Sequence, residues 1–532
     1  MSTVITSLFL LPSLCVLLLL VIIPSAFANR HVRGMIRLAT AATAMTAVAG
    51  LIGLLTSQLV SPTHVRCTLI DFSSPIQLSV YVDGISALML TLVASVGWVV
   101  CKFSVRYLDG EPQQGNYFRW TGFTIGAVSL FVVAGNVPLM IFGLLLTSIG
   151  LHYLLVHYKD RPAARRAAAT KFVFSRIGDV CLAIAGVLLF KEFGTLEFPQ
   201  LFAAATAASD AVVSNSRSLP IAGGLLVMCA VFKSAQFPFH TWLPETMEAP
   251  TPVSAMMHAG IVNAGGYLLI RMAPVVSLAP VVSLAPAAMW LAAGLGAFTA
   301  IFAALVMMSQ TSVKRTLAWS TIAQMGFMIL QCGLGAFSAA MLHIIAHSLY
   351  KAHAFLSSGS VMADSYAMAG VETKTRSGLA SAAAFCVAAA LTGGIFISAS
   401  SVVGVSLVSK PGGFLLGFVL CLSLTRWQWQ TLLNGPQFLL RGIATTMVLI
   451  AAYLVSFSMV DAVVVGAFEE VSVAGDNWLL NSLAIAFAAL MFGELLIRKY
   501  ARSAWLQRLY VHSSNGFYLD TIWNRATKVF SA

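Results

Sequence analysis

The middle of the chain reads Ile221-Ala-Gly-Gly-Leu-Leu-Val-Met-Cys-Ala-Val-Phe-Lys233-Ser-Ala-Gln-Phe-Pro-Phe-His240. A run of apolar and small residues ends at Lys233, and prolines follow at Pro238 and Pro244. Such a run is typical of a membrane-spanning helix. Prolines at membrane depth interrupt a helix and free backbone carbonyls. The stretch therefore predicts a broken membrane helix with a lysine at the break.

The rest of the chain has the same apolar character. Of 532 residues, 59% are hydrophobic and only 9% are charged, which excludes a soluble fold. Apolar runs of about 20 residues recur from Leu8 to Leu496, and lipid offers backbone groups no hydrogen-bond partners, so each run should be a helix. We predict an all-α polytopic membrane protein with about 13 to 15 transmembrane helices. The first run, residues 6–28, has no basic segment before it, so we expect a retained span, not a signal peptide.

The placement of charge predicts the orientation. The net charge is +12, and the basic residues gather in alternate loops: Arg30, Arg33 and Arg37; Lys102, Arg106 and Arg119; Lys159, Arg161, Arg165, Arg166 and Lys171. The positive-inside rule then puts these loops in the cytoplasm and the N-terminus outside. The basic excess needs no nucleic acid to explain it. The eight cysteines are scattered without a CxxC pair and suggest neither disulfides nor a thiolate metal site.

Ionisable residues deep in apolar helices are expensive, so each one is a candidate for function. Arg176 and Asp179 are three residues apart and share a helical face, where they form either a structural salt bridge or a support for a pathway. Lys233 has no acidic residue within two helical turns, so its partner must come from another helix or from water. Glu245 and Glu248 follow the break, and we expect them near the cytoplasmic end.

Histidines mark two further helices. His258 lies on a small, apolar face and is either a hydrogen-bonded core histidine or a proton relay beside Lys233. His343, His347 and Lys351 recur every four residues and should form one stripe. An HxxxH pair can bind zinc, but no Cys, Asp or Glu in that segment completes a site, so the stripe favours a proton path. Lys314 is expected at a cytoplasmic loop as a topological anchor.

No catalytic motif accompanies these residues. The chain has no P-loop, dinucleotide-binding, HExxH or GxSxG pattern. We therefore expect a transport subunit with no active site and no cofactor of its own, driven by an ion gradient or by a partner. The aromatic and basic tail from Arg498 to Ala532 should either lie on the membrane surface or dock on a partner.

The stretch from Lys233 to His258 closely resembles the signature of the antiporter-like membrane subunits of respiratory complex I and of Mrp cation/proton antiporters. The resemblance extends over roughly residues 80 to 365 and includes Phe174-Ser-Arg-Ile-Gly-Asp179 and Lys314-Arg-Thr-Leu-Ala-Trp-Ser-Thr-Ile-Ala-Gln324. It implies two inverted repeats with broken helices, at 111–275 and 286–425, between N-terminal helices (1–110) and C-terminal helices with the tail (426–532). The implied cation pathway is Lys233, His258, His343, His347 and Lys351, supported by Arg176, Asp179, Glu245, Glu248, His152 and Lys314.

At two places the sequence differs from the motifs of the complex I subunits. Leucine replaces the family's acidic residue in the segment from Gly143 to His152, and Leu391-Thr-Gly-Gly-Ile-Phe-Ile replaces a later proline-rich motif. The Leu-Thr-Ser-x-x-Leu-His152 pattern and the terminal Ser-Asn-Gly-Phe-Tyr-Leu-Asp520 resemble instead the DabB family, the membrane subunits of inorganic-carbon accumulation complexes.

The DabB resemblance implies a function. A proton or sodium ion would enter through this chain in the bacterial inner membrane. Its influx would drive hydration of CO2 to bicarbonate in a DabA-like soluble zinc subunit at the cytoplasmic face. Three alternatives remain: a proton-translocating subunit of an NADH or ferredoxin quinone oxidoreductase, an Mrp-type cation/proton antiporter, or a scaffold that conducts nothing.

Overall fold

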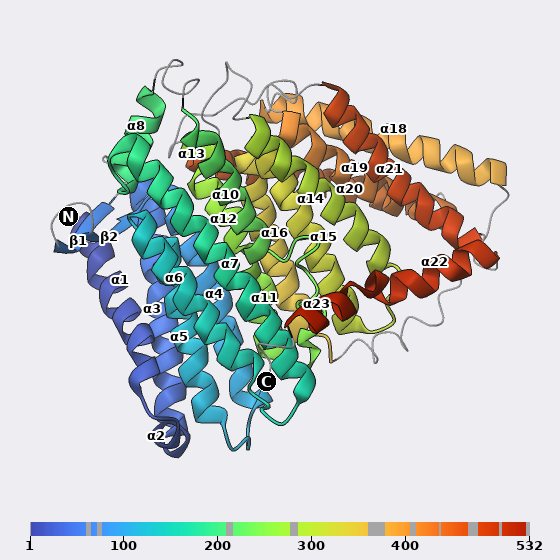
Figure 1. Cartoon of the computed structure of the whole chain (residues 1–532). Helices are drawn as coiled ribbons and strands as arrows, with labels where there is room; N and C mark the ends of the chain where they lie inside the picture. The colour runs from blue at the N-terminus through green and yellow to red at the C-terminus, as the bar shows by residue number, and fades with distance from the viewer. Residues whose placement is uncertain are drawn as a thin grey trace.

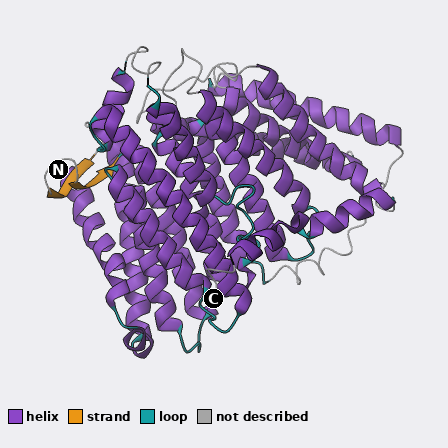
Figure 2. Cartoon of the chain, viewed as in Figure 1, coloured by secondary structure: helices purple, strands orange, loops and turns teal. Residues whose placement is uncertain are grey.

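The structure is a computed structural model that describes residues 2–59, 65–71, 77–208, 216–276, 286–359, 378–404, 411–435, 438–465, 477–499 and 503–527. Long helices packed side by side make up nearly all of it (Figures 1 and 2). Eight described helices are long and apolar enough to cross a membrane, and three shorter apolar helices accompany them. The prediction of a multi-pass helical membrane protein is confirmed. The count of 13 to 15 spans, which rests on apolar run length alone, stays a prediction.

The helices of the first half follow the apolar runs of the sequence. They are α1 (Ser2–Leu19), α2 (Ser25–Arg30), α3 (Val32–Leu59), α4 (Gly84–Tyr107), α5 (Gln114–Val132), α6 (Val137–Leu155), α7 (Pro162–Phe193), α8 (Phe198–Ala207), α10 (Ser218–Lys233), α11 (Thr251–Ala259), α12 (Ala264–Arg271) and α13 (Ala273–Val276). Short 3-10 turns stand at η1 (Leu20–Ile22), η2 (Thr246–Glu248) and η3 (Ile261–Asn263).

The second half continues the bundle with α14 (Pro286–Met307), α15 (Val313–Gly333), α16 (Phe337–Leu356), α18 (Gly378–Val403), α19 (Pro411–Asn434), α20 (Leu439–Val465) and α21 (Asn477–Lys499). The tail forms α22 (Ala504–Ser514), η5 (Gly516–Tyr518) and α23 (Leu519–Thr527). In Figure 1 these last elements, in red, run back from α21 across the bundle toward α11. The tail thus packs on its own chain, an arrangement that neither expectation for it included.

A small β-hairpin was not predicted. β1 (Val65–Asp71) and β2 (Gln77–Val82) pair antiparallel beside the N-terminal helices. Their β-branched and aromatic residues favour strands, but the stretch is too short and polar for the apolar-run criterion to reveal it. Asp83 ends the hairpin and begins α4, since its side chain accepts a hydrogen bond from the Ser86 backbone N–H at 2.9 Å in a capping box.

The predicted break in the central helix is present. α10 ends at Lys233, and the chain then passes through irregular backbone to α11. A second break at Gly260 and η3 divides α11 from α12. Gly265 lets α12 touch α10, because a Cβ atom there would lie only 2.4 Å from the Ala230 carbonyl oxygen. In the second half α18 is continuous, which fits the absence of the proline-rich motif from its sequence.

Candidate cation pathway

A group of charged side chains lies between α7 and α10. Lys233 Nζ is 2.5 Å from Asp179 Oδ1, and Arg176 approaches Asp179 Oδ2 at 2.8 Å in an ion pair without hydrogen-bond geometry. The sequence left open whether Asp179 pairs with Arg176 and where Lys233 finds its partner. In the structure the Asp179 carboxylate pairs with both Arg176 and Lys233. Burial makes this arrangement stronger than a surface pair.

Lys171 corrects one prediction. The sequence assigned it to a basic cytoplasmic loop, but it lies within α7 with only 5% of its surface exposed. Its ammonium donates to Ser148 Oγ at 2.9 Å and to the Ser148 carbonyl at 3.2 Å, both in α6. The long alanine-rich start of α7 extends the helix past the apolar run and carries Lys171 inward. His152 lies one turn along α6 from Ser148, with its ring 5.6 Å from that of Phe172 in α7.

A second group gathers around α11 and α16. His258 is fully buried, its Nδ1 lies 3.0 Å from Thr321 Oγ1 of α15, and its ring stacks on Phe355 at 4.4 Å. Its Nε2 has no hydrogen-bond partner among the described protein atoms. Buried polar groups in proteins are almost always paired with protein or ordered water, so this nitrogen is a natural point for water to enter a relay.

The stripe on α16 is buried along its length. His343, His347 and Lys351 are 8%, 5% and 0% exposed, and the two imidazole rings lie 6.1 Å apart. Lys351 Nζ donates to the Leu317 carbonyl at 3.0 Å. Within the described ranges no ion pair is found for Lys351, and no three potential metal ligands cluster. Its ammonium also lies 5.5 Å from the centre of the Tyr350 ring, so its described contacts are a carbonyl and an aromatic ring.

His343 sits between two amide side chains. Gln331 Oε1 faces its Nδ1 at 2.9 Å, and Gln324 Oε1 faces its Nε2 at 2.7 Å. An imidazolium donates from both nitrogens, whereas a neutral ring donates from only one. Turning one amide would therefore match the surroundings to either protonation state. This arrangement suits a side chain that repeatedly gains and loses a proton.

Polar residues at the second helix break connect the two groups. Ser234, next to Lys233, donates to the Val262 carbonyl at 2.7 Å. Asn263 Nδ2 donates to Ser348 Oγ at 2.8 Å, beside His347 on α16. Among the described residues no hydrogen bond joins the Lys233 and His258 side chains, and the polar contacts of the break at η3 lie near each of them in the sequence. Sequence reasoning missed Asn263 and Ser348, although an asparagine inside an apolar helix was a usable signal.

The Thr321→Val substitution tests the orientation of His258. Valine keeps the shape of threonine but removes the hydroxyl, and loss of one hydrogen bond costs about 1 kcal/mol. We expect several-fold slower cation flux in proteoliposomes, with the protein still assembled. Thr316→Val on the exposed face of the same helix is the control, since its hydroxyl bonds only the Ser312 carbonyl. Equal flux in the two variants would show that the Thr321 contact does not orient His258 for transport.

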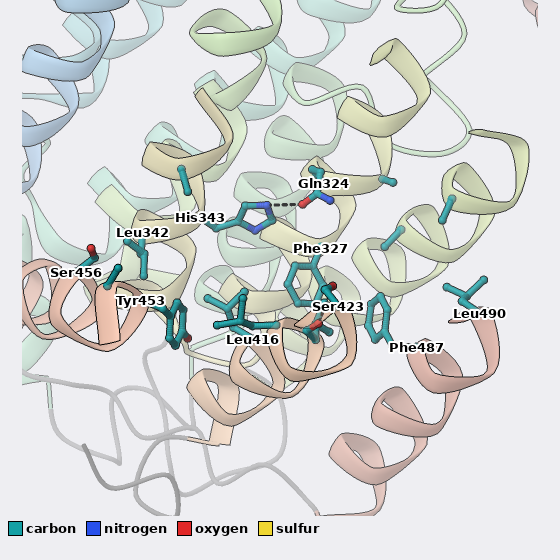
Figure 3. Close-up of a pocket in the computed structure, with 17 residues that line it drawn as sticks. Gln324, Phe327, Leu342, His343, Leu416, Ser423, Tyr453, Ser456, Phe487 and Leu490 are labelled. Atoms are coloured by element: carbon teal, nitrogen blue, oxygen red, sulfur yellow. Dashed lines mark hydrogen bonds between the residues drawn. The ribbon is translucent and has the colours of Figure 1, made fainter. Parts of the chain in front are cut away.

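A cavity of about 610 Å³ opens beside His343 (Figure 3). Its lining is mostly carbon, with Phe327, Leu416 and Phe487 opposite the His343–Gln324 pair and a few hydroxyls such as Tyr453 at its edge. Apolar cavities tend to stay dry. Mostly apolar walls from α14, α15, α19, α20 and α21 thus border His343 on this side.

The remaining predicted supporting residues lie outside these two groups. Glu248 forms a half-exposed ion pair with Arg161 at 2.5 Å, so it ties the loop before α7 to η2. Glu245 is partly buried in the irregular segment, and Lys314 is partly exposed in the first turn of α15. The position of Lys314 at a helix end agrees with an anchor role.

A third buried charge pair was missed entirely. Arg271 at the end of α12 lies 2.5 Å from Asp83, with 2% and 7% of the two side chains exposed. The guanidinium also faces the rings of Tyr81 and Phe198 at 4.7 and 5.3 Å. The pair joins the start of α4, next to the hairpin, to the end of α12.

Comparison with known proteins shows the family to which the chain belongs. A family model described as NADH:quinone oxidoreductase/Mrp antiporter, transmembrane, matches residues 134–435, and a complex I chain 5 N-terminal model matches residues 70–118. A protein named probable inorganic carbon transporter subunit DabB2, from Halothiobacillus neapolitanus, is 36% identical over 461 residues, which cover 83% of this chain and 79% of the relative. The chain belongs to the DabB group of the complex I/Mrp antiporter-like family.

Two further relatives, a DabB subunit and a complex I subunit, differ in how much of the chain they match. The probable DabB subunit of Hydrogenovibrio crunogenus is 34% identical over 82% of this chain and 81% of its own length. NADH-quinone oxidoreductase subunit L of Escherichia coli is 37% identical, but over only 55% of this chain and 46% of that protein. The similarity to these two DabB proteins thus extends over more of the chain than the similarity to the complex I subunit.

Solved structures confirm the fold class. A chain of the Mrp complex from Dietzia superposes with a TM-score of 0.66 at 22% identity, covering 97% of this DabB-group chain and 59% of the other. A chain of an archaeal membrane-bound sulfane sulfur reductase gives a TM-score of 0.55 at 18% identity, with 98% and 99% coverage. The all-helical antiporter-like architecture is therefore shared.

Proposed function

We propose that this chain conducts protons across the bacterial inner membrane and thereby energises inorganic carbon accumulation. The observation that carries the proposal is the set of buried polar contacts at Lys233 and Asp179, at the break at η3, at His258 and along the α16 stripe. Ionisable groups at membrane depth are costly, so their occurrence on four helices, α7, α10, α11 and α16, favours use over coincidence.

The side chains favour protons over sodium as the coupling ion. Lysine and histidine carry protons by titration, whereas a bound sodium ion needs several oxygen ligands. Both oxygens of Asp179 already face cations, Lys233 on one side and Arg176 on the other. In the described part of this group Asp179 is the only carboxylate, and Lys171 adds a third positive side chain nearby.

The DabB similarity supports inorganic carbon as the accumulated species. In the proposed cycle, proton entry drives the hydration of CO2 to bicarbonate in a DabA-like soluble zinc subunit. That partner would bind at the cytoplasmic face, the face that the basic loops predict, with the N-terminus outside. The chain itself would supply the proton path and no catalytic site.

Growth of a carbonic-anhydrase-deficient bacterium in ambient air tests the proposal. The gene is expressed alone, with its neighbouring gene, and with both plus an uncoupler. We expect rescue only when both genes are present, and loss of rescue with the uncoupler. Failure of rescue by a verified assembled complex would favour the alternative role in a redox-linked oxidoreductase or an Mrp-type antiporter.

A further inference from the structure

The C-terminal tail reaches the helix break that carries Lys233. Trp523 of α23 donates its indole N–H to the Pro238 carbonyl at 2.9 Å. Its ring meets Phe174 of α7 edge-on at 5.0 Å and lies 5.4 Å from Phe239. The backbone after Lys233 is irregular, so its carbonyls lack helical partners, and the tail donates a hydrogen bond to one of them.

The same aromatic cluster borders the Asp179–Lys233 pair. Phe174 lies near the ring of Phe232, the residue before Lys233, at 6.4 Å, and Phe232 packs on Phe239 at 4.3 Å. Gly178, next to Asp179, fits against Phe232 and the Lys233 side chain. Trp523 therefore belongs to a cluster of rings that includes Phe232, the chain neighbour of Lys233.

Other contacts fix the tail in place. Ser513 Oγ lies 3.0 Å from Ser309 Oγ, Gln310 donates to the Ser514 carbonyl at 3.3 Å, and Phe517 packs against Phe302 at 5.5 Å. These contacts hold α22 and η5 against the turn between α14 and α15, so α23 arrives at the break in one defined position. A tail lying freely on the membrane surface would need none of them.

We propose that Trp523 is a positioning residue for Lys233. The contacts of Trp523 hold the broken segment closed over the Asp179–Lys233 pair. This inference rests on the proposed role of Lys233 in the pathway. On this proposal the tail acts on its own chain, because a movement of α23 would change the access of water to Lys233. The tail would then be the element through which events at this face reach the pathway.

A native cysteine allows a direct test. Cys229 is fully buried in α10, one helical turn before Lys233. Its labelling by N-ethylmaleimide, followed in the full-length protein in proteoliposomes by peptide mass spectrometry, reports opening of this region. Labelling does not depend on transport, so the result stands apart from the proposed function. Cys332, equally buried in α15, reports general loosening.

We expect Trp523→Ala to raise the labelling rate of Cys229 about two- to tenfold, because the variant loses one hydrogen bond and the packing of the indole ring. The labelling rate of Cys332 should stay unchanged. Trp523→Phe, which keeps a ring but lacks the N–H, should give a smaller rise. Trp505→Phe, on an exposed tryptophan of α22, is the matched control and should change nothing. An unchanged Cys229 rate in Trp523→Ala, or an equal rise at Cys332, would overturn the proposal.

The pH profile of proton flux supplies the second readout. Partial opening over Lys233 changes how readily this group exchanges protons with water, so Trp523→Ala should shift the profile, and Trp523→Phe should restore part of the wild-type profile. A uniform loss of flux at every pH, without a shift, would show only a structural role.

Discussion

The Lys233→Ala substitution is expected to reduce proton flux and carbon-dependent growth to background while the protein still assembles. Alanine removes the titratable group at the helix break. Arg176 remains beside Asp179 at 2.8 Å, so the buried carboxylate keeps one positive partner. Removing one member of a buried pair can cost about 3–5 kcal/mol, and the remaining arginine should keep the loss below that range. Flux in proteoliposomes and the thermal unfolding midpoint are the two measurements.

The Lys233→Arg variant separates charge from proton transfer. Arginine stays protonated at all relevant pH values, so it can pair with Asp179 but cannot relay a proton. We expect normal stability and no flux. Lys191→Arg, at the exposed end of α7, is the matched control for the exchange of lysine for arginine and should leave flux unchanged. Substantial flux through Lys233→Arg would show that this lysine need not titrate.

The Asp83→Asn substitution should give the largest loss of stability. It leaves Arg271, 2% exposed, as an unpaired charge among Tyr81 and Phe198, and such a change typically costs about 3–5 kcal/mol. We expect a clearly lower thermal midpoint, measured on purified protein in lipid nanodiscs. Asp109→Asn, at an exposed position, should leave the midpoint unchanged.

Replacing both partners tests the cause of that loss. Asp83→Asn combined with Arg271→Met removes the stranded charge, and exchange of a whole buried pair for neutral groups is often nearly neutral. The double variant should therefore recover most of the lost stability. A double variant as unstable as Asp83→Asn alone would mean that the hydrogen-bonded cap of α4, and not the ion pair, is what the substitution destroys.

Local patterns in the sequence predicted the helices, the break after Lys233 and the α16 stripe. Apolar runs in a membrane leave helix as the regular choice, and a period near four places His343, His347 and Lys351 on one side. These inferences need only neighbouring residues. The roles of the pathway residues stay predictions, since geometry alone brings them together without showing transport.

Long-range pairings could not be predicted in this way. Asp179 and Lys233 are 54 positions apart, Asp83 and Arg271 188, and Pro238 and Trp523 285. Which helices pack together is set by side-chain fit over the whole bundle, and a single sequence does not reveal it. Lys171 was misplaced for a related reason: its helix begins in a charged, alanine-rich segment that looks like a loop by hydropathy but has high helix propensity.

The close approach at Gly265 limits how this protein can move. With no space for even a methyl group between α12 and the Ala230 carbonyl, and with the Gly265 N–H donating to Ser234 Oγ at 3.1 Å, α10 and α12 are locked at their crossing. In shear motions, packed helices slide past one another by small distances. The close backbone contact at this crossing opposes such sliding of α10 against α12. In the proposed pathway, protons that pass this crossing would therefore move by rotation of side chains and reorientation of water, while α10 and α12 keep their positions.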